Sequence, residues 1–326
     1  MKVKLTLLCL AAVAATAATA AGPASDAAAR SPIRVGLADQ SPAMFDSPEF
    51  KRLRIRRTRY FVAADVMQSA RKRNHAREFV RAARRSRASV LLHISTADLR
   101  PKRGKVVSRG AYRRNVRRIV AYFRKLGVRD FGVWNEANHK TQETWNRPGH
   151  AASYFKSMYS AVRRRCRSCS IVALDVLDQR GVQRYIRRFY GHLSRTWRRR
   201  AKIVGIHNYS DVNRSRSRGT ALIIRTVRRL NRRAQFWFTE TGAAASFGGS
   251  FPYDESRQAR VMPNMFRYAN RYRRRGVRRV YAYNWFGIEN GGCGRSCRFD
   301  AGLVDPDGTP RPVLSVFRRQ LAGFRR

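Results

Sequence analysis

The chain of 326 residues has 70 Lys and Arg against 20 Asp and Glu, a formal net charge of +50, with 43% hydrophobic and 11% aromatic residues. Disordered chains combine high charge with few apolar residues, so this apolar content excludes an intrinsically disordered protein. The length fits one large domain or two small ones.

The first 21 residues have the pattern of a secretory signal peptide. Lys2 and Lys4 precede an apolar run over residues 5–13, and Ala18 and Ala20 have the spacing of a cleavage site. The run is too short to cross a bilayer, and no later stretch reaches the roughly 18 consecutive apolar residues of a membrane helix. We therefore expect a soluble protein that is secreted or associated with the cell wall.

Removal of this segment would leave residues 22–30 as a disordered linker and residues 31–326 as one folded domain. Cys9 would also be removed, so that the mature chain has two local cysteine pairs, Cys166 with Cys169 and Cys293 with Cys297. An even number of cysteines in an exported protein favours disulfides. A zinc site built from both pairs is the alternative, and it would require them to converge in space.

Eight short apolar runs alternate along the chain with Arg-rich amphipathic stretches. They cover residues 33–37, 59–63, 89–94, 130–134, 170–174, 203–207, 235–239 and 279–285. Strands that alternate with helices pair in parallel, and eight such units in about 295 residues predict a (β/α)8 TIM barrel. An open doubly wound sheet is the alternative, but no glycine-rich phosphate loop follows the first strand.

One intervening helix is predicted over residues 112–126. Val116, Ile119, Val120 and Phe123 share one face of it, and the Arg residues lie largely on the other.

Acidic residues follow each predicted strand, at the end of the barrel where this fold carries its chemistry. They are Asp39, Asp65, Asp98, Glu136, Asp175 or Asp178, Asp211, Glu240 and Glu289. Asp also caps helices at strand-to-helix turns, so we assign most of the Asp residues to capping. The two Glu residues that follow aromatic strand residues, Glu136 and Glu240, are the candidates for chemistry.

Glu136 and Glu240 would end the fourth and seventh strands, across the mouth of the barrel from each other. Apolar surroundings raise the pKa of a carboxyl group. One neutral and one ionised carboxyl group are what the hydrolysis of a glycosidic bond requires. The alternative is that both are buried ion-pair partners of the abundant Arg residues.

Several motifs around these residues resemble the retaining glycoside hydrolases of clan A. They are Trp134-Asn135-Glu136, residues 205–209 (GIHNY), residues 237–242 (WFTETG), Tyr283-Asn284-Trp285 and residues 302–310 (GLVDPDGTP). The resemblance covers residues 31–326 and is closest to the cellulase-like and family-thirty-nine-like bacterial members. Ala137 stands where many of these relatives have proline. This difference affects the shape of the loop, and so the expected substrate preference, rather than the chemistry.

The resemblance implies that Glu136 is the general acid/base and Glu240 the nucleophile, with no cofactor and no metal. Asn135 would bind the sugar 2-hydroxyl, Tyr209 would donate to the nucleophile, and Trp285 would be the platform beneath the reacting sugar. The other expected sugar-binding residues are Trp134, His207, His93 and Tyr60, of which His93 and Tyr60 could equally be polar residues of the core.

On a barrel, Cys166 and Cys169 precede the fifth strand, whereas Cys293 and Cys297 follow the eighth, so the pairs lie at opposite ends. This favours two disulfides over one zinc site, and the second would brace the loop beside the active site.

Sixty of the basic residues are Arg, spread over every predicted helix. The charge could attract an anionic cell-surface polymer, or it could reflect composition alone. Specific nucleic-acid binding is disfavoured because no recognition motif accompanies the charge. We expect a secreted enzyme that cleaves a β-linked polysaccharide or oligosaccharide with retention. A non-catalytic carbohydrate-binding barrel and a cell-surface transglycosylase are the alternatives.

Overall fold

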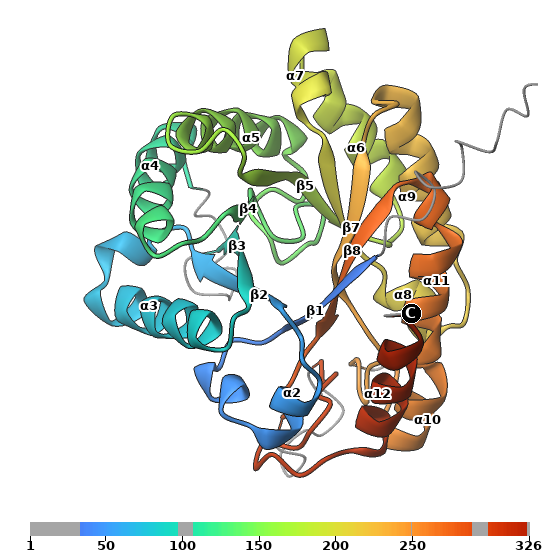
Figure 1. The fold of residues 1–326 in the computed structure, drawn as a ribbon. Coiled ribbons are helices and arrows are strands. Elements are labelled where there is room, and N and C mark those ends of the chain that lie inside the picture. The colour runs from blue at the N-terminus through green and yellow to red at the C-terminus, as the bar shows by residue number, and fades with distance from the viewer. Residues whose placement is uncertain (1–32, 97–106, 249, 289–298, 325–326) are drawn as a thin grey trace, which may run out of the picture. The chain divides into compact units, whose positions relative to one another are not determined.

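Eight parallel strands close into a barrel in which each strand pairs with its neighbours in chain order (Figure 1). They are β1 (Arg34–Ala38), β2 (Arg57–Ala63), β3 (Ser89–Ser95), β4 (Asp130–Gly132), β5 (Ser170–Leu177), β6 (Ile203–His207), β7 (Gln235–Thr241) and β8 (Val277–Tyr283). Pairing of β1 with β8 completes the ring, so the predicted (β/α)8 fold is confirmed and the open sheet is excluded.

This computed structural model describes residues 33–96, 107–248, 250–288 and 299–324. The predicted signal peptide and linker, Asp98, Glu289, Cys293 and Cys297 lie outside the described residues, so expectations about them stay predictions. Within the described ranges, each helix is too short or too polar to cross a lipid bilayer.

Helices surround the barrel and connect successive strands (Figure 1). The α-helices are α2 (Pro48–Arg52), α3 (Ala70–Arg85), α4 (Arg109–Lys125), α5 (Pro148–Arg163), α6 (Val182–Gly191), α7 (Arg195–Arg200), α8 (Tyr209–Asn213), α9 (Arg218–Leu230), α10 (Glu255–Val261), α11 (Pro263–Arg271) and α12 (Pro312–Phe324). Short 3₁₀ turns are η1 (Pro42–Phe45), η2 (Val66–Gln68) and η3 (Arg273–Arg275).

The helix predicted over residues 112–126 is α4, and it begins three residues earlier than expected. Ser108 caps it by accepting a hydrogen bond from the Ala111 N–H, which explains the earlier start. The four apolar residues of the predicted face are all buried. Burial of this apolar face, rather than helix propensity alone, holds the Arg-rich helix against the barrel.

A separate small cluster fills the barrel interior near the amino ends of the strands. It contains Leu91, Val172, Trp237 and Tyr281. Beside it, the Arg279 guanidinium lies over the Trp237 ring and pairs with Asp130 at 2.5 Å. This packing fills the barrel interior below the carboxyl end.

Cys166 and Cys169 form a disulfide just before β5, with Cα atoms 5.4 Å apart. Its place at the amino end of β5 is the one predicted from the fold.

Candidate active site

Glu136 and Glu240 lie at the carboxyl ends of β4 and β7, where a carboxylate oxygen of one is within 4.8 Å of a carboxylate oxygen of the other. Glu136 has a φ of 46°, a left-handed conformation that is uncommon for a residue with a side chain. Glu240 lies where the register between β7 and β8 shifts. The side chains are 17% and 10% exposed, so both can be reached from the mouth.

Two donors hold the Glu240 carboxylate in place. Arg59 Nη1 donates to Oε2 at 2.7 Å, and the Tyr209 hydroxyl donates to Oε1 at 3.0 Å. Burial raises the pKa of the Glu240 carboxyl, and the nearby charges of His207 and Arg59 oppose that rise. Burial also raises the pKa of Tyr209 well above its usual range, so its hydroxyl keeps the proton that it donates.

Arg59 is a central residue of the site that the sequence did not reveal. It is fully buried in β2, and it donates to Asn135 Oδ1 through Nη2 and to His93 Nδ1 through Nε at 3.2 Å. One side chain therefore positions Glu240 and Asn135 together. The only indication in the sequence was a base inside an apolar strand, and it was hidden among 60 Arg residues.

His207 lies between three carboxyl groups. Its Nδ1 is 3.1 Å from Glu136 and 3.6 Å from Glu240, and its Nε2 is 2.8 Å from Asp175. Burial alone would lower the pKa of His207, but the charges of Asp175 and Glu240 and hydrogen bonds with Asp175 and Glu136 raise it to about 10. His207 is therefore a buried cation at neutral pH, in contact with both candidate catalytic residues.

Asp175 is the fully buried partner beneath His207. Burial acts to raise its pKa, but His207, His93 and Arg59 together hold the pKa well below its usual range. The Thr239 hydroxyl also donates to it. Asp175 is thus an exception among the Asp residues that we assigned to capping.

Other Asp residues at the strand ends bind backbone N–H groups, although only some of these groups are at helix starts, as capping would require. Asp178 accepts from Ser210 and Asp211 at the start of α8, and Asp39 accepts from Trp285 at 2.9 Å. These side chains fix the loops around the mouth.

Two glycines make room for the buried polar groups. A Cβ on Gly132 would lie 2.0 Å from the His93 ring, and one on Gly205 would lie 1.8 Å from Asp175 Oδ1. Any larger residue would therefore displace a member of the network.

Tyr60 and Trp134 do not line the site. For Tyr60 this matches the alternative of a core residue, and for Trp134 it differs from the prediction. Tyr60 stacks on Phe79 of α3, with ring centroids 4.2 Å apart, and Trp134 packs against Tyr154 of α5. Successive strand residues point to opposite faces, so their neighbours Arg59 and Asn135 point inward while these two rings point to the helices.

His93 and Trp285 also differ from the expected sugar contacts. His93 lies inside the barrel beneath Arg59, where burial lowers its pKa to about 3, so it is a neutral positioning residue. Trp285 is fully buried and edge-on to Phe50, with ring centroids 5.6 Å apart. Neither face of its indole is open, and the predicted platform is absent from this conformation.

Aromatic residues that the sequence did not single out lie next to Tyr209. Its ring contacts Phe299 at 4.7 Å and Phe247 at 6.3 Å between centroids. Phe247 is 37% exposed, so this cluster offers an apolar surface to a ligand.

Glu136, His207 and Glu240 also have the arrangement of three metal ligands. Their chemistry fits an ion-pair network better. Nδ1 of His207 already faces Glu136 at 3.1 Å, and Arg59 Nη1 already donates to one oxygen of Glu240 at 2.7 Å.

No family model and no curated protein matches the sequence. Solved structures of glycosidases share the fold. The β-glycosidase BGL167 is 12% identical with a TM-score of 0.60, over 87% of this chain and 84% of its own. GH5_18 from Streptomyces cattleya, solved with GlcNAc, is 14% identical with a TM-score of 0.62, over 90% and 80%. Xylanase 10B from Thermotoga maritima is 14% identical with a TM-score of 0.59, over 90% and 95%. The chain therefore shares the (β/α)8 barrel fold of these glycosidases.

Proposed function

We propose that this protein is an O-glycosyl hydrolase that cleaves a β-linked glycan with retention of configuration. The observation that carries the proposal is the short separation of Glu136 and Glu240, with carboxylate oxygens within 4.8 Å. Retaining enzymes hold their two carboxyl groups about 5–5.5 Å apart, whereas inverting enzymes hold them about 6.5–9.5 Å apart to admit a water molecule. The proximity of the two glutamates supports the assignment to the first class.

The reaction has two steps. Glu240 attacks the anomeric carbon while the proton of Glu136 passes to the departing glycosidic oxygen, so that one C–O bond forms and another breaks. Glu136, now ionised, then takes a proton from water, and the resulting oxygen nucleophile displaces Glu240 and restores both groups.

The surrounding residues prepare each carboxyl group for its role. Arg59 and Tyr209 hydrogen-bond the ionised form of Glu240 and direct its oxygens, and charge-assisted hydrogen bonds of this kind are the strong ones. Two buried cations, Arg59 and His207, face three carboxyl groups. Glu136 is the more exposed of the two glutamates, so it is open to the departing group and to water.

The test compares Glu240→Gln, Glu136→Gln and the control Glu143→Gln on 2,4-dinitrophenyl β-glucoside, β-xyloside and β-mannoside. Glu143 lies in the same loop as Glu136, but its carboxylate accepts from the Val107 N–H. Glu240→Gln should lose turnover by orders of magnitude, because it removes the nucleophile. Glu136→Gln should still release the activated phenol in the first step and stall in the second, and Glu143→Gln should remain active.

Near-normal turnover by Glu240→Gln would refute the assignment. If NMR shows that the α-anomer is the first product, retention is refuted. No turnover of any glycoside by the unmodified protein, together with measurable sugar binding, would favour the non-catalytic barrel.

A further inference from the structure

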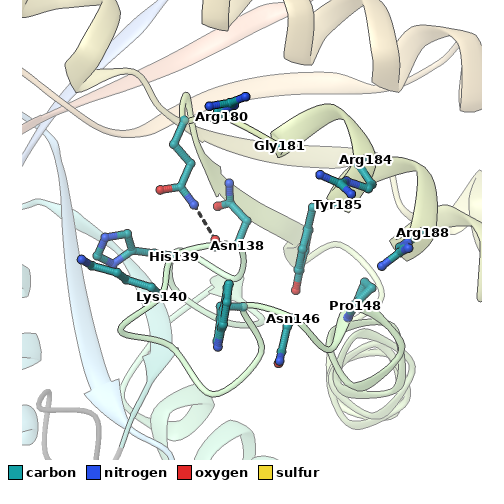
Figure 2. Close-up of a pocket in the computed structure, with 12 residues that line it drawn as sticks. Asn138, His139, Lys140, Asn146, Pro148, Arg180, Gly181, Arg184, Tyr185 and Arg188 are labelled. Atoms are coloured by element: carbon teal, nitrogen blue, oxygen red, sulfur yellow. Dashed lines mark hydrogen bonds between the residues drawn. The ribbon is translucent and has the colours of Figure 1, made fainter.

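A cavity of about 550 Å³ opens beside the mouth, between the loop after β4 and the start of α6 (Figure 2). Its basic side chains are Lys140, Arg180, Arg184 and Arg188, and its aromatic side chains are Trp145 and Tyr185. All come from segments that follow β4 and β5, so the cavity is at the end of the barrel that holds Glu136 and Glu240.

His139 connects this cavity to Glu136. It lines the cavity, and its Nδ1 is 3.8 Å from Glu136 Oε2 and 2.6 Å from the Thr141 hydroxyl. Glu136 donates its proton to the oxygen of the departing sugar in the proposed reaction. The cavity therefore lies next to the carboxyl group that would face the departing sugar.

The cavity walls are fixed by hydrogen bonds between the two loops. The Asn138 amide exchanges hydrogen bonds with the Leu177 backbone at 2.9 and 3.1 Å, and Gln179 donates to the Asn138 carbonyl. The Tyr185 hydroxyl donates to the Thr144 carbonyl at 2.9 Å. The site is therefore largely pre-formed, which reduces the entropy cost of binding.

The four bases of the cavity carry uncompensated charge. No Asp or Glu is among its lining residues, and within the described part of the chain none of the four bases forms an ion pair or a hydrogen bond. Arg184 and Arg188 are four residues apart on α6, so they share one face. A guanidinium binds a carboxylate or sulfate through two parallel hydrogen bonds, which matches an anionic ligand.

Trp145 supplies a different kind of contact. It is 50% exposed, one of three large hydrophobic residues exposed in the described ranges, together with Phe247 and Tyr253. An open aromatic face packs against the apolar face of a sugar ring. Exposed tryptophan beside unpaired bases therefore points to a ligand that is both saccharide and anion.

A second basic cavity shows that charge alone does not define such a site. It has a volume of about 770 Å³ and lies at the amino ends of β6 and β7, away from the mouth. Its lining includes Arg199, Lys202 and Arg233 but no aromatic residue. Arg198, also in this cavity, already donates to the Tyr190 and Leu193 carbonyls.

We propose that the cavity beside Glu136 is a subsite for an anionic sugar unit, one that bears a carboxylate or sulfate, on the leaving-group side of the bond to be cleaved. This inference rests on the proposed function, since that function assigns the leaving-group side. Trp145 stacks on the sugar ring, and Lys140, Arg180, Arg184 and Arg188 surround its anionic group.

The test measures binding by calorimetry in a Glu240→Gln background, which prevents cleavage. The probes are cellohexaose, a hexamer of β-1,4-linked glucuronate and a 6-O-sulfated cellohexaose. The protein should bind at least one anionic hexamer more tightly than cellohexaose, and the better one identifies the substituent. Arg184→Gln/Arg188→Gln should raise its Kd about tenfold, since each exposed pair contributes modestly. Trp145→Ala should weaken all three hexamers.

The matched control is Arg199→Gln/Arg233→Gln, which removes the same charge from the second basic cavity and should change Kd less than twofold. The proposal would be overturned if both double variants lost the same affinity for the anionic hexamer, or if the protein bound neutral and anionic hexamers equally well. Equally tight binding of a thymidine oligonucleotide that is weakened by the same variants would assign the cavity to nucleic acid instead. Because binding needs no turnover, the proposed activity can fail while the subsite stands, and the reverse also holds.

Discussion

Replacement of Asp175 by Asn removes the buried negative charge beneath His207 and preserves the shape of the side chain. The pKa of His207 is raised from its ordinary value of 6.5 to about 10, and Asp175 is the first of the groups that raise it. This rise corresponds to roughly 5 kcal/mol of interaction free energy that favours the protonated over the neutral form of His207. We expect Asp175→Asn to lower the free energy of unfolding by about 3 kcal/mol near pH 6, in the range for breaking a buried ion pair.

The pH dependence of this loss follows from both partners. His207 has a raised pKa in the folded protein, so its contribution is fully present below about pH 6.5 and is lost as the pH rises toward 10. Asp175 has a lowered pKa, so its contribution is present above its ordinary value of 3.8 and is lost at lower pH. The difference between wild type and variant should therefore be largest between about pH 4 and 6.5.

Urea denaturation followed by tryptophan fluorescence from pH 4 to 9.5 measures this difference. Asp178→Asn is the matched control, because Asp178 is a buried carboxylate at the same strand end that binds backbone N–H groups. Burial, with the Asp211 charge, raises the pKa of Asp178 to about 7. The difference in the free energy of unfolding between wild type and Asp178→Asn should therefore change with pH below pH 7 and stay constant above it. A difference for Asp175→Asn that is constant from pH 6 to 9.5 would refute the ion-pair reasoning.

Three further results are expected. Gly205→Ala places a Cβ 1.8 Å from a buried carboxylate oxygen and should lower the melting temperature, with a loss of about 1–3 kcal/mol, whereas Gly191→Ala has no atom within 4 Å and should not. Tyr209→Phe removes a hydrogen bond to the ionised Glu240, so kcat/KM should fall roughly 10- to 100-fold and the acid limb of its pH profile should move to higher pH; an unchanged limb would contradict the role of Tyr209. Cys166→Ser opens a very short loop at the amino end of the barrel. Urea denaturation should show that the free energy of unfolding falls by about 2 kcal/mol or less, and turnover should be unchanged.

The strands and the two glutamates were predictable because each depends on a local pattern. Short apolar runs at regular spacing specify strands, and a glutamate after aromatic residues at the end of a run specifies an acid at the barrel mouth. The limits of the strands were less certain. β4 ends at Gly132 and β8 at Tyr283, each two residues before the predicted end, because the chain turns there to build the site.

The direction of side chains was harder to predict. Asn135 and Trp134 were both assigned to the site, although neighbouring residues of an extended chain point to opposite faces. Stricter use of this alternation would have placed Trp134 and Tyr60 among the helices. The choice between Asp175 and Asp178 could not be made from the sequence, because the register of β5 against β6 shifts between Val172 and Leu174.

The balance of buried charge has a consequence for ionic strength. Arg59 and His207 offset Asp175 and Glu240 inside the barrel, at distances far shorter than the Debye length of about 10 Å in 0.1 M salt. Added salt therefore leaves these pairs intact while it screens the Arg-rich exterior. Electrolyte should slow the capture of an anionic polymer and leave the bond-breaking step on a small neutral glycoside unchanged, so the two halves of catalysis respond differently to the same ions.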